Sequence, residues 1–498
     1  MDGTQPEPEQ SSEGAREDRA QGRSREPGRT PRPKAAAFLL SLPAAGWRAP
    51  CAFTLCLAPI LLGAGLWIAL GPVDLARPAA WLALALVTLG WWGALAWARF
   101  VPDSFALAVV LASGALALRV GFLASELALS DDVNRYVWEG ALVAEGLDPY
   151  RLAPAAPELA AERARWGELH AGLNHPEVPA AYPPLAQALH AALVALVDGA
   201  EHPGRARLAL RLLYGCADLL VCLPLARLLA RRGRPRAWLA AWAWNPWVAQ
   251  EFAGAAHLDA LAILCALAAL ACVPARARLA ERGAHLAAVL LAAGALIKLL
   301  PAAFAPFVLR RARRPGSAAL VFLGALALGC LPFVLRTGAL PGVAGLGEYA
   351  FRWESFSLLH RWLEPLFARA FAFDERWSDP RRLARAVELL AWLGLALLAW
   401  RRRLEPARAA AWLCAGFLAL TPTLHPWYLA WSVPFLALRP SLPWLALASL
   451  APLLYAPLAR WRAEGLWVEP PWLYPLVVAL LGGAFLLELL LRRRRAPA

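Results

Sequence analysis

Charged residues are scarce in this chain of 498 residues, and lysine is almost absent. Only 17% of the residues are charged, and Lys34 and Lys298 are the only two lysines. A soluble globular domain has roughly 25% charged and about 45–50% apolar residues, whereas this sequence is 60% hydrophobic with a mean hydropathy of +0.48. The shortage of charge therefore argues against a soluble fold and in favour of a polytopic membrane protein.

The motifs of several common site classes are also missing. The eight cysteines form no CxxC pair, lie at no Cys/His metal spacing and fall mostly within apolar runs. They are typical of small buried hydrophobic residues. The chain contains neither an HExxH spacing nor the GxGxxG or P-loop glycine motifs that cradle nucleotide phosphates. These absences exclude a cysteine-based metal site and argue against a nucleotide site.

The basic residues, which give a net charge of +14, are grouped in short runs. Arginine runs occur at 231–236, 310–314 and 401–403 and again close to the C-terminus. This grouping is the positive-inside pattern of membrane proteins, because the runs separate long apolar segments. We therefore expect no nucleic-acid partner, since topology already explains the charge.

Apolar runs of about 20 residues, long enough to cross a bilayer, recur along nearly the whole chain. They predict an all-α fold, a polytopic transmembrane helical bundle with about 14 crossings and cytoplasmic termini. Residues 1–35 are polar and predict a disordered cytoplasmic tail. The 14 crossings are expected at about 51–70, 79–97, 104–124, 207–230, 237–250, 258–274, 285–298, 299–309, 317–336, 382–400, 407–424, 426–438, 442–459 and 473–491.

The arginine runs set the sidedness of the loops. They place external loops at 125–182 and 337–381. Residues 184–199 are apolar but short and begin at a Pro-Pro pair. If this segment crossed the membrane, the run at 231–236 would lie outside, so we predict an interfacial helix there. The resulting parts are the tail, two additional N-terminal helices at 46–100, a core at 101–310 and C-terminal helices at 311–498.

In this scheme the polar segments that are not simply basic all lie at the outer face. Polar groups near membrane level are costly and usually serve a site or a pathway. Several such segments on one side therefore predict one external site. They are SDDVNRYVWEG (130–140), LDPYRLAP (147–154), NHPEVPAAYPPLAQ (174–187), WNPWVAQEFAGAAHLDA (244–260), IKLLP (297–301), GLGEYAFRWESFSLLHRW (345–362) and TLHPWYLAW (423–431).

Two acidic residues, Asp131 and Asp132, open the first of these segments. If the segment is helical, Asp132, Arg135 and Glu139 approach one another at spacings of three and four residues. The pair has two interpretations: a solvated helix start with a capping aspartate, or part of a site. The other polar segments favour a site.

Lys298 stands alone at the outer turn of an apolar hairpin. Such an ammonium group can bind a phosphate as a point charge, with Arg135 and Arg352 as helpers. The alternative is a side chain that extends to the interface.

Histidines accompany these charges. His425 could act as a general base, a metal ligand or a hydrogen-bond donor. His257, Asp259 and the Asp131-Asp132 pair could together bind a divalent metal through oxygen and imidazole ligands. The polar segments also carry aromatic residues, which suit either an interfacial belt or stacking on a sugar. We expect the substrate to contact Tyr136, Glu139, Tyr182, Gln187, Glu251, His257, Asp259, Trp427 and Tyr428.

Taken in order, SDDVNRYVWEG, GLDPYRLAP, NHPEVPAAYPPLAQ, WNPWVAQEFAGAAHLDAL, LIKLLPAAFAPFVL and HPWYLAW resemble the GT-C membrane glycosyltransferases. Within them the chain is most similar to the bacterial polyprenyl-phosphate-dependent mannosyltransferase branch. The similarity covers residues from about 104 to 440, so the two preceding helices are additional to the minimal core. Asn134 and Glu139 depart from the motif, in which an aromatic residue and an aspartate are common.

The resemblance implies a GT-C fold in the cytoplasmic (inner) membrane, with interfacial helices, surrounding membrane lipids and an extracytoplasmic active site. It implies transfer of a hexose, with mannose expected, from a polyprenyl-phosphate sugar donor to a lipid-linked or cell-envelope glycan acceptor. Asp132 matches the catalytic aspartate, Asp131 lies beside it, and His425 matches an assisting histidine. A single Asp base favours inversion, by analogy with glycosidases.

Two other classes of function fit a polytopic chain. One is a transporter or lipid-linked sugar flippase, and the other is a non-catalytic assembly subunit. Transporters collect polar groups near the midplane, on broken helices of paired repeats. The one-sided placement of the polar segments here favours a glycosyltransferase.

Overall fold

The computed structural model describes residues 47–71, 75, 77–125, 129–274, 277–338, 340–371 and 379–494. Over these residues the chain is all-α without a β-strand, and a single isolated bridge joins Leu279 and Ala312. The predicted helical fold is therefore confirmed. The predicted tail at 1–35 lies outside the described residues.

Seven helical segments of the described chain are long and apolar enough to cross a bilayer, or up to nine if each of two bent helix pairs is one span. The predicted count of about 14 crossings is not confirmed. The segments are α1–α2 (Arg48–Leu55 and Leu57–Leu70), α3 (Pro78–Trp97) with the turn that follows it, α4 (Phe105–Ala124), α9–α10 (Pro203–Leu220 and Cys222–Arg231), α16 (Pro315–Thr337), α19 (Pro380–Arg401) and α24 (Leu473–Arg493).

Several predicted crossings correspond to shorter or broken helices. Helices α14 (Glu281–Ala295) and α20 (Pro406–Leu420) have 15 residues each, fewer than the roughly 20 that a bilayer requires. The predicted crossing at 237–250 is divided into α11 (Ala240–Ala243) and α12 (Pro246–Ala249). Pro246 explains the break, because proline lacks an N–H and disfavours helical geometry in the residue before it. Helix α8 (Pro184–Leu196) is also short, with 13 residues.

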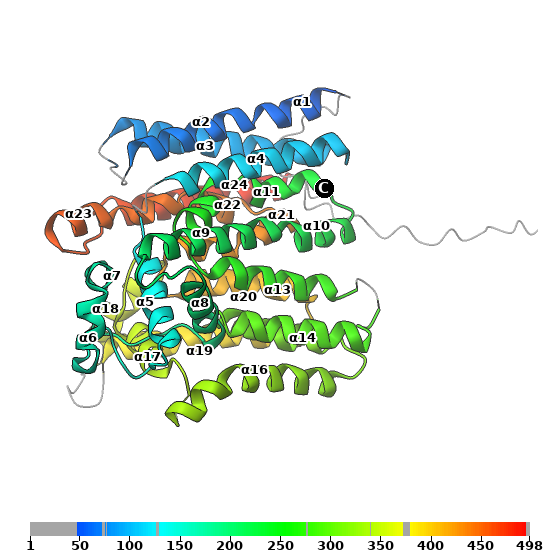
Figure 1. Cartoon of the computed structure of the whole chain (residues 1–498). Helices are drawn as coiled ribbons and strands as arrows, with labels where there is room; N and C mark the ends of the chain where they lie inside the picture. The colour runs from blue at the N-terminus through cyan, green and yellow to red at the C-terminus, as the bar shows by residue number, and fades with distance from the viewer. Residues whose placement is uncertain are drawn as a thin grey trace, which may run out of the picture.

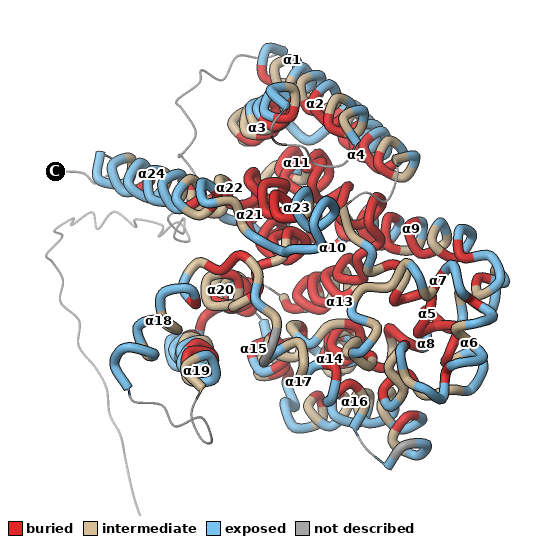
Figure 2. The backbone as a smooth tube through the Cα atoms, turned by 90° about the vertical axis from the view of Figure 1, so that its left-hand side faces the viewer, coloured by how far each residue is buried: buried red, intermediate tan, exposed pale blue. Residues whose placement is uncertain are grey.

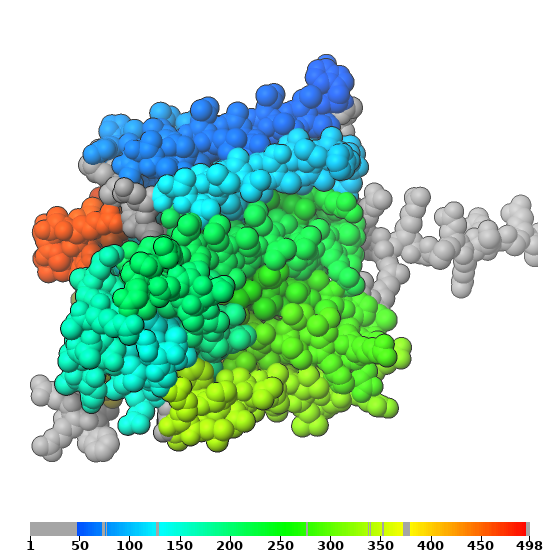
Figure 3. Space-filling model, viewed as in Figure 1, coloured from blue at the N-terminus to red at the C-terminus, as the bar shows by residue number. Residues whose placement is uncertain are grey.

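The long helices lie side by side, and several of the shorter helices gather at one end of the bundle (Figure 1). That end carries α5 (Asp132–Ala144), α6 (Ala160–Arg165), α7 (Gly167–Ala171), α8, α17 (Val343–Arg352) and α18 (His360–Ala370). Figure 3 shows the segment that follows α4 covering this end of the surface. The polar segments at 130–140, 174–187 and 345–362 therefore share one end of the molecule.

Three of the arginine runs meet at the opposite end. Arg232 pairs with Glu405 at 2.8 Å, and Arg310 donates to the Trp400 carbonyl oxygen at 3.3 Å. The run at 231–236 begins at the C-terminal end of α10, and in Figure 1 that end points away from α5. The molecule thus has one strongly basic end and one end of mixed polar character, as a sided membrane protein requires.

The outer helices present apolar side chains outward. On α16, Leu320, Leu328 and Leu335 are each at least 70% exposed. Figure 2 shows buried residues concentrated in α11 and α13 (Asp259–Cys272), and exposed residues along α16 and α24. An apolar exterior around a packed centre suits lipid surroundings, and together with the long apolar helices it defines a multi-pass membrane protein.

Helix α5 is fixed in position by close packing on α8. A Cβ atom added at Gly140 would lie 2.8 Å from the carbonyl carbon and 2.9 Å from the carbonyl oxygen of His190. The backbones of the two helices therefore approach more closely than any side chain at residue 140 allows. Since α5 begins at Asp132, this contact also sets the position of the aspartate.

Gly140→Ala is expected to lower the thermal stability of the protein. The added methyl group meets backbone atoms that cannot rotate away, and such overpacking costs about 1–3 kcal/mol. Gly204→Ala is the matched control, because it is also helical but no atom lies within 4 Å of its added Cβ. Thermal unfolding in detergent measures both variants. Equal midpoints for Gly140→Ala and the wild type would contradict the packing argument.

Candidate active site

A cavity of about 2350 Å³ opens at the end of the bundle that carries α5. A pocket for a drug-sized ligand typically has about 300–1,000 Å³, so this cavity has room for more than one reactant. Its wall includes the start of α5, the loop before α8, the turn after α14, α17 and the 3₁₀ helix η7 (Pro426–Trp431). Among the predicted residues that line it are Asp131, Asp132, Tyr182, Lys298, His425 and Tyr428.

The two aspartates at the start of α5 face the loop before α8. Asp131 occupies the N-cap position but makes no capping hydrogen bond through its side chain. Instead, its Oδ1 accepts a hydrogen bond from Asn174 Nδ2 at 2.6 Å, and Asp132 Oδ1 lies 3.4 Å from the same nitrogen. The geometry therefore does not support the interpretation as a helix cap.

Asp132 is partly enclosed, and its side chain retains 18% exposure. Tyr182 donates its hydroxyl proton to Asp132 Oδ2 at 3.3 Å. Burial and the neighbouring Asp131 charge raise the pKa of Asp132 to about 6, although Lys298, Asn174 and Tyr182 act in the opposite direction. A carboxylate with this pKa is ionised at neutral pH and still basic enough to accept a proton from a hydroxyl group in a transition state.

A buried chain of polar groups lies behind Asp132. His257 Nδ1 is 3.8 Å from Asp132 Oδ2, and His257 Nε2 is 3.4 Å from Glu251 Oε2. Tyr455 donates to the same Glu251 oxygen at 2.8 Å. His257 has no exposed surface, so it approaches Asp132 from inside the protein rather than from the cavity.

A backbone break brings this chain of polar groups to the site. The π-helix η5 (Gln250–Gly254) follows α12, and α13 then begins at a bend of 118°. Between them Ala256 has a φ of +62°, a conformation that non-glycine residues rarely adopt. π-Helical turns and strained backbone often occur at functional sites. Here they place Glu251, His257 and Asp259 close together in space.

Lys298 lies at the cavity wall, just after α14. Its Nζ is 3.5 Å from Asp259 Oδ2 and lies 5.3 Å and 5.1 Å from the ring centres of Tyr182 and Tyr428. Trp431 donates to the other Asp259 oxygen at 2.7 Å. The ammonium group is thus held between a carboxylate and two aromatic faces, and with 20% exposure it is still reachable from the cavity.

The structure places His257 Nδ1 3.8 Å from Asp132 Oδ2, and the predicted assisting residue His425 lies close to His257. The Trp427 indole stacks with both imidazoles, at ring-centre distances of 3.9 Å to His257 and 4.3 Å to His425. Burial and the Lys298 charge lower the pKa of His425 to about 3. His425 is therefore a neutral imidazole on the wall of the cavity that Asp132 also lines.

Three other predicted residues form a separate network. Arg135 pairs with Glu139 at 3.0 Å and donates to the carbonyl oxygens of His175 and Val178 at 3.1 and 2.8 Å. Gln187 donates to Glu139 at 2.6 Å. These contacts tie the loop before α8 to α5. They also occupy the guanidinium of Arg135, which the sequence predicted as a helper in phosphate binding.

The remaining predicted residues are Tyr136 and Arg352. Tyr136 stacks on the His190 ring, with ring centres 4.7 Å apart, and its hydroxyl is 3.5 Å from that of Tyr182. It therefore supports the site from behind. The side chain of Arg352 lies outside the described residues.

Three residues of the site were not singled out from the sequence. Asn174 contacts both aspartates, and the Tyr349 hydroxyl is 2.6 Å from that of Tyr428. Asn174 and Tyr349 lie within the polar segments 174–187 and 345–362, so the sequence indicates the segments but not these two residues. Tyr455 lies in a predicted crossing, where an isolated tyrosine carries no such signal.

The predicted metal ligands do not assemble at this site. In the part of the chain that the structure describes, the single group of three candidate ligands within 4.8 Å of one another is Glu354, His360 and Glu364. His257, Asp259 and the aspartate pair do not form such a group. They make the pairwise contacts given above instead.

Comparison with protein families identifies the chain. Residues 43–313 match the family described as alpha-(1->6)-mannopyranosyltransferase, N-terminal domain. The match covers more than half of the chain and includes Asp132, His257 and Lys298, so the protein belongs to this family. The predicted mannosyltransferase-like GT-C branch is confirmed, and the protein is a membrane glycosyltransferase. No curated protein and no solved structure matches the chain.

Proposed function

We propose that the enzyme moves a hexose, with mannose the expected sugar, from a polyprenyl-phosphate donor to a lipid-linked or cell-envelope glycan. The proposal rests on one observation: a base, Asp132, and a cation, Lys298, line the same cavity. Tyr182 contacts both, since its hydroxyl donates to Asp132 and its ring lies 5.3 Å from Lys298 Nζ. Sugar transfer from a phosphate donor requires these two groups close to one reacting centre.

In the proposed reaction Asp132 accepts the proton of an acceptor hydroxyl as its oxygen attacks the anomeric carbon of the donor. The bond between that carbon and the phosphate oxygen breaks, and polyprenyl phosphate leaves with the bonding electrons. Lys298 stabilises the charge that grows on the leaving phosphate. Direct attack of this kind, with no covalent sugar–enzyme intermediate, inverts the configuration of the anomeric carbon. Asp131 is secondary, and it raises the pKa of Asp132.

The proposed location is the outer face of the cytoplasmic membrane. The basic runs at 231–236, 310–314 and 401–403 lie at the end of the bundle away from α5, and basic loops favour the cytoplasm. The cavity then opens on the external side. A polyprenyl chain keeps the donor in the bilayer, so a cavity at the membrane surface is where its head group can meet a glycan.

Single-cysteine labelling tests this orientation. In a cysteine-free background, Arg234→Cys is expected to react with a membrane-impermeant maleimide only after the cells are opened. Glu168→Cys, at an exposed position near the cavity end, is expected to react in intact cells. The reverse pattern would place the active site in the cytoplasm and contradict the proposed location.

Asp132→Asn is expected to lower sugar transfer by about 10²–10⁴-fold, the contribution of a positioned base. The assay uses purified protein in lipid vesicles with radiolabelled mannose on polyprenyl phosphate and a membrane glycan acceptor. A normal gel-filtration profile of the variant shows that it folds. If Asp132→Asn transfers sugar at the wild-type rate, the base lies elsewhere, and absence of transfer by the wild type would count against this donor.

Asp131→Asn is the matched control and has a signature of its own. The active form of the base is the carboxylate, so wild-type activity is expected to fall as the pH drops through about 6, the pKa of Asp132. Removing the Asp131 charge lowers that pKa, so the acid limb of the pH profile moves to lower pH while the rate at neutral pH changes little. An unchanged acid limb would show that Asp132 does not control it.

Lys298→Gln is expected to raise the donor KM and lower kcat together. The phosphate carries charge when the donor binds and more charge when the glycosidic bond breaks, so losing the cation affects both states and the transition state more. Lys298→Arg, which keeps the charge, is expected to retain more activity than Lys298→Gln. If Lys298→Gln has wild-type kinetics, the lysine only packs against Asp259 and the tyrosine rings.

A further inference from the structure

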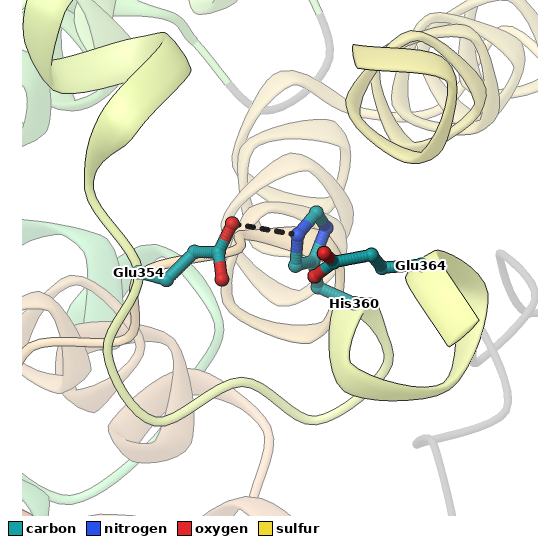
Figure 4. Close-up of side chains that lie close together, drawn as sticks. All are labelled: Glu354, His360 and Glu364. Atoms are coloured by element: carbon teal, nitrogen blue, oxygen red, sulfur yellow. Dashed lines mark ion pairs between the residues drawn. The ribbon is translucent and has the colours of Figure 1, made fainter. Parts of the chain in front are cut away.

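A second cluster of titratable side chains lies outside the residues that match the family. Glu354 follows α17 in a loop, and His360 and Glu364 lie one turn apart on α18 (Figure 4). Residues four apart on a helix project from the same face, and here that face meets the loop. One candidate ligand atom from each of the three side chains lies within 4.8 Å of the others.

His360 is the buried member of this cluster, with a side chain only 3% exposed. Its Nδ1 is 3.2 and 3.1 Å from the two oxygens of Glu388 on α19. Its Nε2 is buried without a hydrogen-bond partner, and the closest Glu354 oxygen is 3.4 Å away. A histidine that donates one ring N–H to a carboxylate and presents the other nitrogen to further ligands is the usual arrangement around a protein-bound metal.

Two arginines hold the carboxylates of the cluster. Arg381 Nε donates to Glu364 Oε1 at 2.9 Å, and Arg385 Nη2 donates to Glu354 Oε1 at 2.9 Å. Carboxylate ligands of metals are themselves commonly held by such hydrogen bonds. With His360 neutral, the three glutamates exceed the two arginines by one negative charge. The cluster therefore has room for a positive charge, and Glu354, with 32% side-chain exposure, gives access from solvent.

We propose that Glu354, His360 and Glu364 form a binding site for one divalent first-row metal ion. One imidazole and two carboxylates favour Zn²⁺ or Mn²⁺ over Mg²⁺ or Ca²⁺, which prefer oxygen ligands alone. Water would complete the coordination, as it does where a protein supplies only three ligands. Glu388 acts as the outer partner that fixes the orientation of the His360 ring.

The ion would fasten α18 to a loop of the cavity wall, because Glu354 lines the cavity. The loop that contains Glu354 pairs with the segment before His425: Ser355 N–H donates to the Pro422 carbonyl oxygen at 3.4 Å, and Leu424 N–H donates to the Phe356 carbonyl oxygen at 2.8 Å. A metal ion bound by this loop and by α18 therefore stabilises the backbone next to His425. Its role is structural, because Glu354, His360 and Glu364 contact α19 rather than Asp132, although Glu354 lines the same cavity.

Metal binding is measured on the full-length protein in detergent, after treatment with EDTA and removal of the chelator. Titration with ZnCl₂, MnCl₂ and MgCl₂ in turn, followed by calorimetry and elemental analysis, is expected to give one bound Zn²⁺ or Mn²⁺ per chain and much weaker binding of Mg²⁺. A bound ion also raises the unfolding temperature, by an amount that grows with the logarithm of the ratio of its concentration to its dissociation constant.

Three variants test the ligand assignment. His360→Asn and Glu364→Gln are expected to lose the bound ion; the glutamine can still accept from Arg381, which preserves the local packing. Glu388→Gln, which changes only the outer partner, is expected to weaken binding by about 10–100-fold. Glu464→Gln is the control, because Glu464 is an equally acidic but exposed residue paired with Arg460 at 2.8 Å on α23 (Pro457–Glu464).

Two outcomes would overturn the proposal. In the first, the wild type binds neither Zn²⁺ nor Mn²⁺ and its unfolding temperature does not respond to them, which would leave His360 with Glu354 and Glu388 as its only partners in this cluster. In the second, Glu364→Gln binds the ion as tightly as Glu464→Gln does. Both readouts are independent of sugar transfer, so this test stands or falls separately from the proposed reaction.

Discussion

An ionised carboxylate can persist at the edge of an apolar bundle only where other groups replace the hydration that it loses. Asp132 meets that condition through Tyr182, Asn174 and Lys298, which together oppose the effects of burial and of the Asp131 charge. The surrounding elements follow from this requirement. The loop before α8 supplies the tyrosine and the amide, the turn after α14 supplies the cation, and the close contact between α5 and α8 sets where the carboxylate lies.

The buried polar groups behind Asp132 depend on an interrupted backbone. A regular helix through residues 246–272 would distribute Glu251, His257 and Asp259 around its surface. The π-helix, the positive φ of Ala256 and the 118° bend bring them to one place instead. The hydrogen-bonding groups that such a break frees in a membrane protein need partners within the protein. The residues around the break are buried in the packed centre, which provides those surroundings.

The sequence predicted the parts of the fold that depend on local hydrophobicity. The runs that became α3, α4, α16, α19 and α24 are long, continuous and apolar, so their length alone defined them. The crossing at 237–250 was expected whole, because its apolar residues outweighed the breaking effect of Pro246. Asp132 and Lys298 could be singled out because charge is so rare here. The contact between Asp132 and His257 joins residues far apart in the chain, and such pairings depend on tertiary packing that no local pattern records.

The near absence of lysine gives the cavity an unusual chemical property. Lys298 carries the one side-chain amine in the part of the chain that the structure describes, and it lines the cavity beside Asp259. Arginine supplies the other strong cations, and guanidinium groups do not react with common acylating reagents under conditions that modify amines. An amine-directed reagent therefore has a single side-chain target within the folded bundle, where its rate of reaction would report directly on occupancy of the cavity.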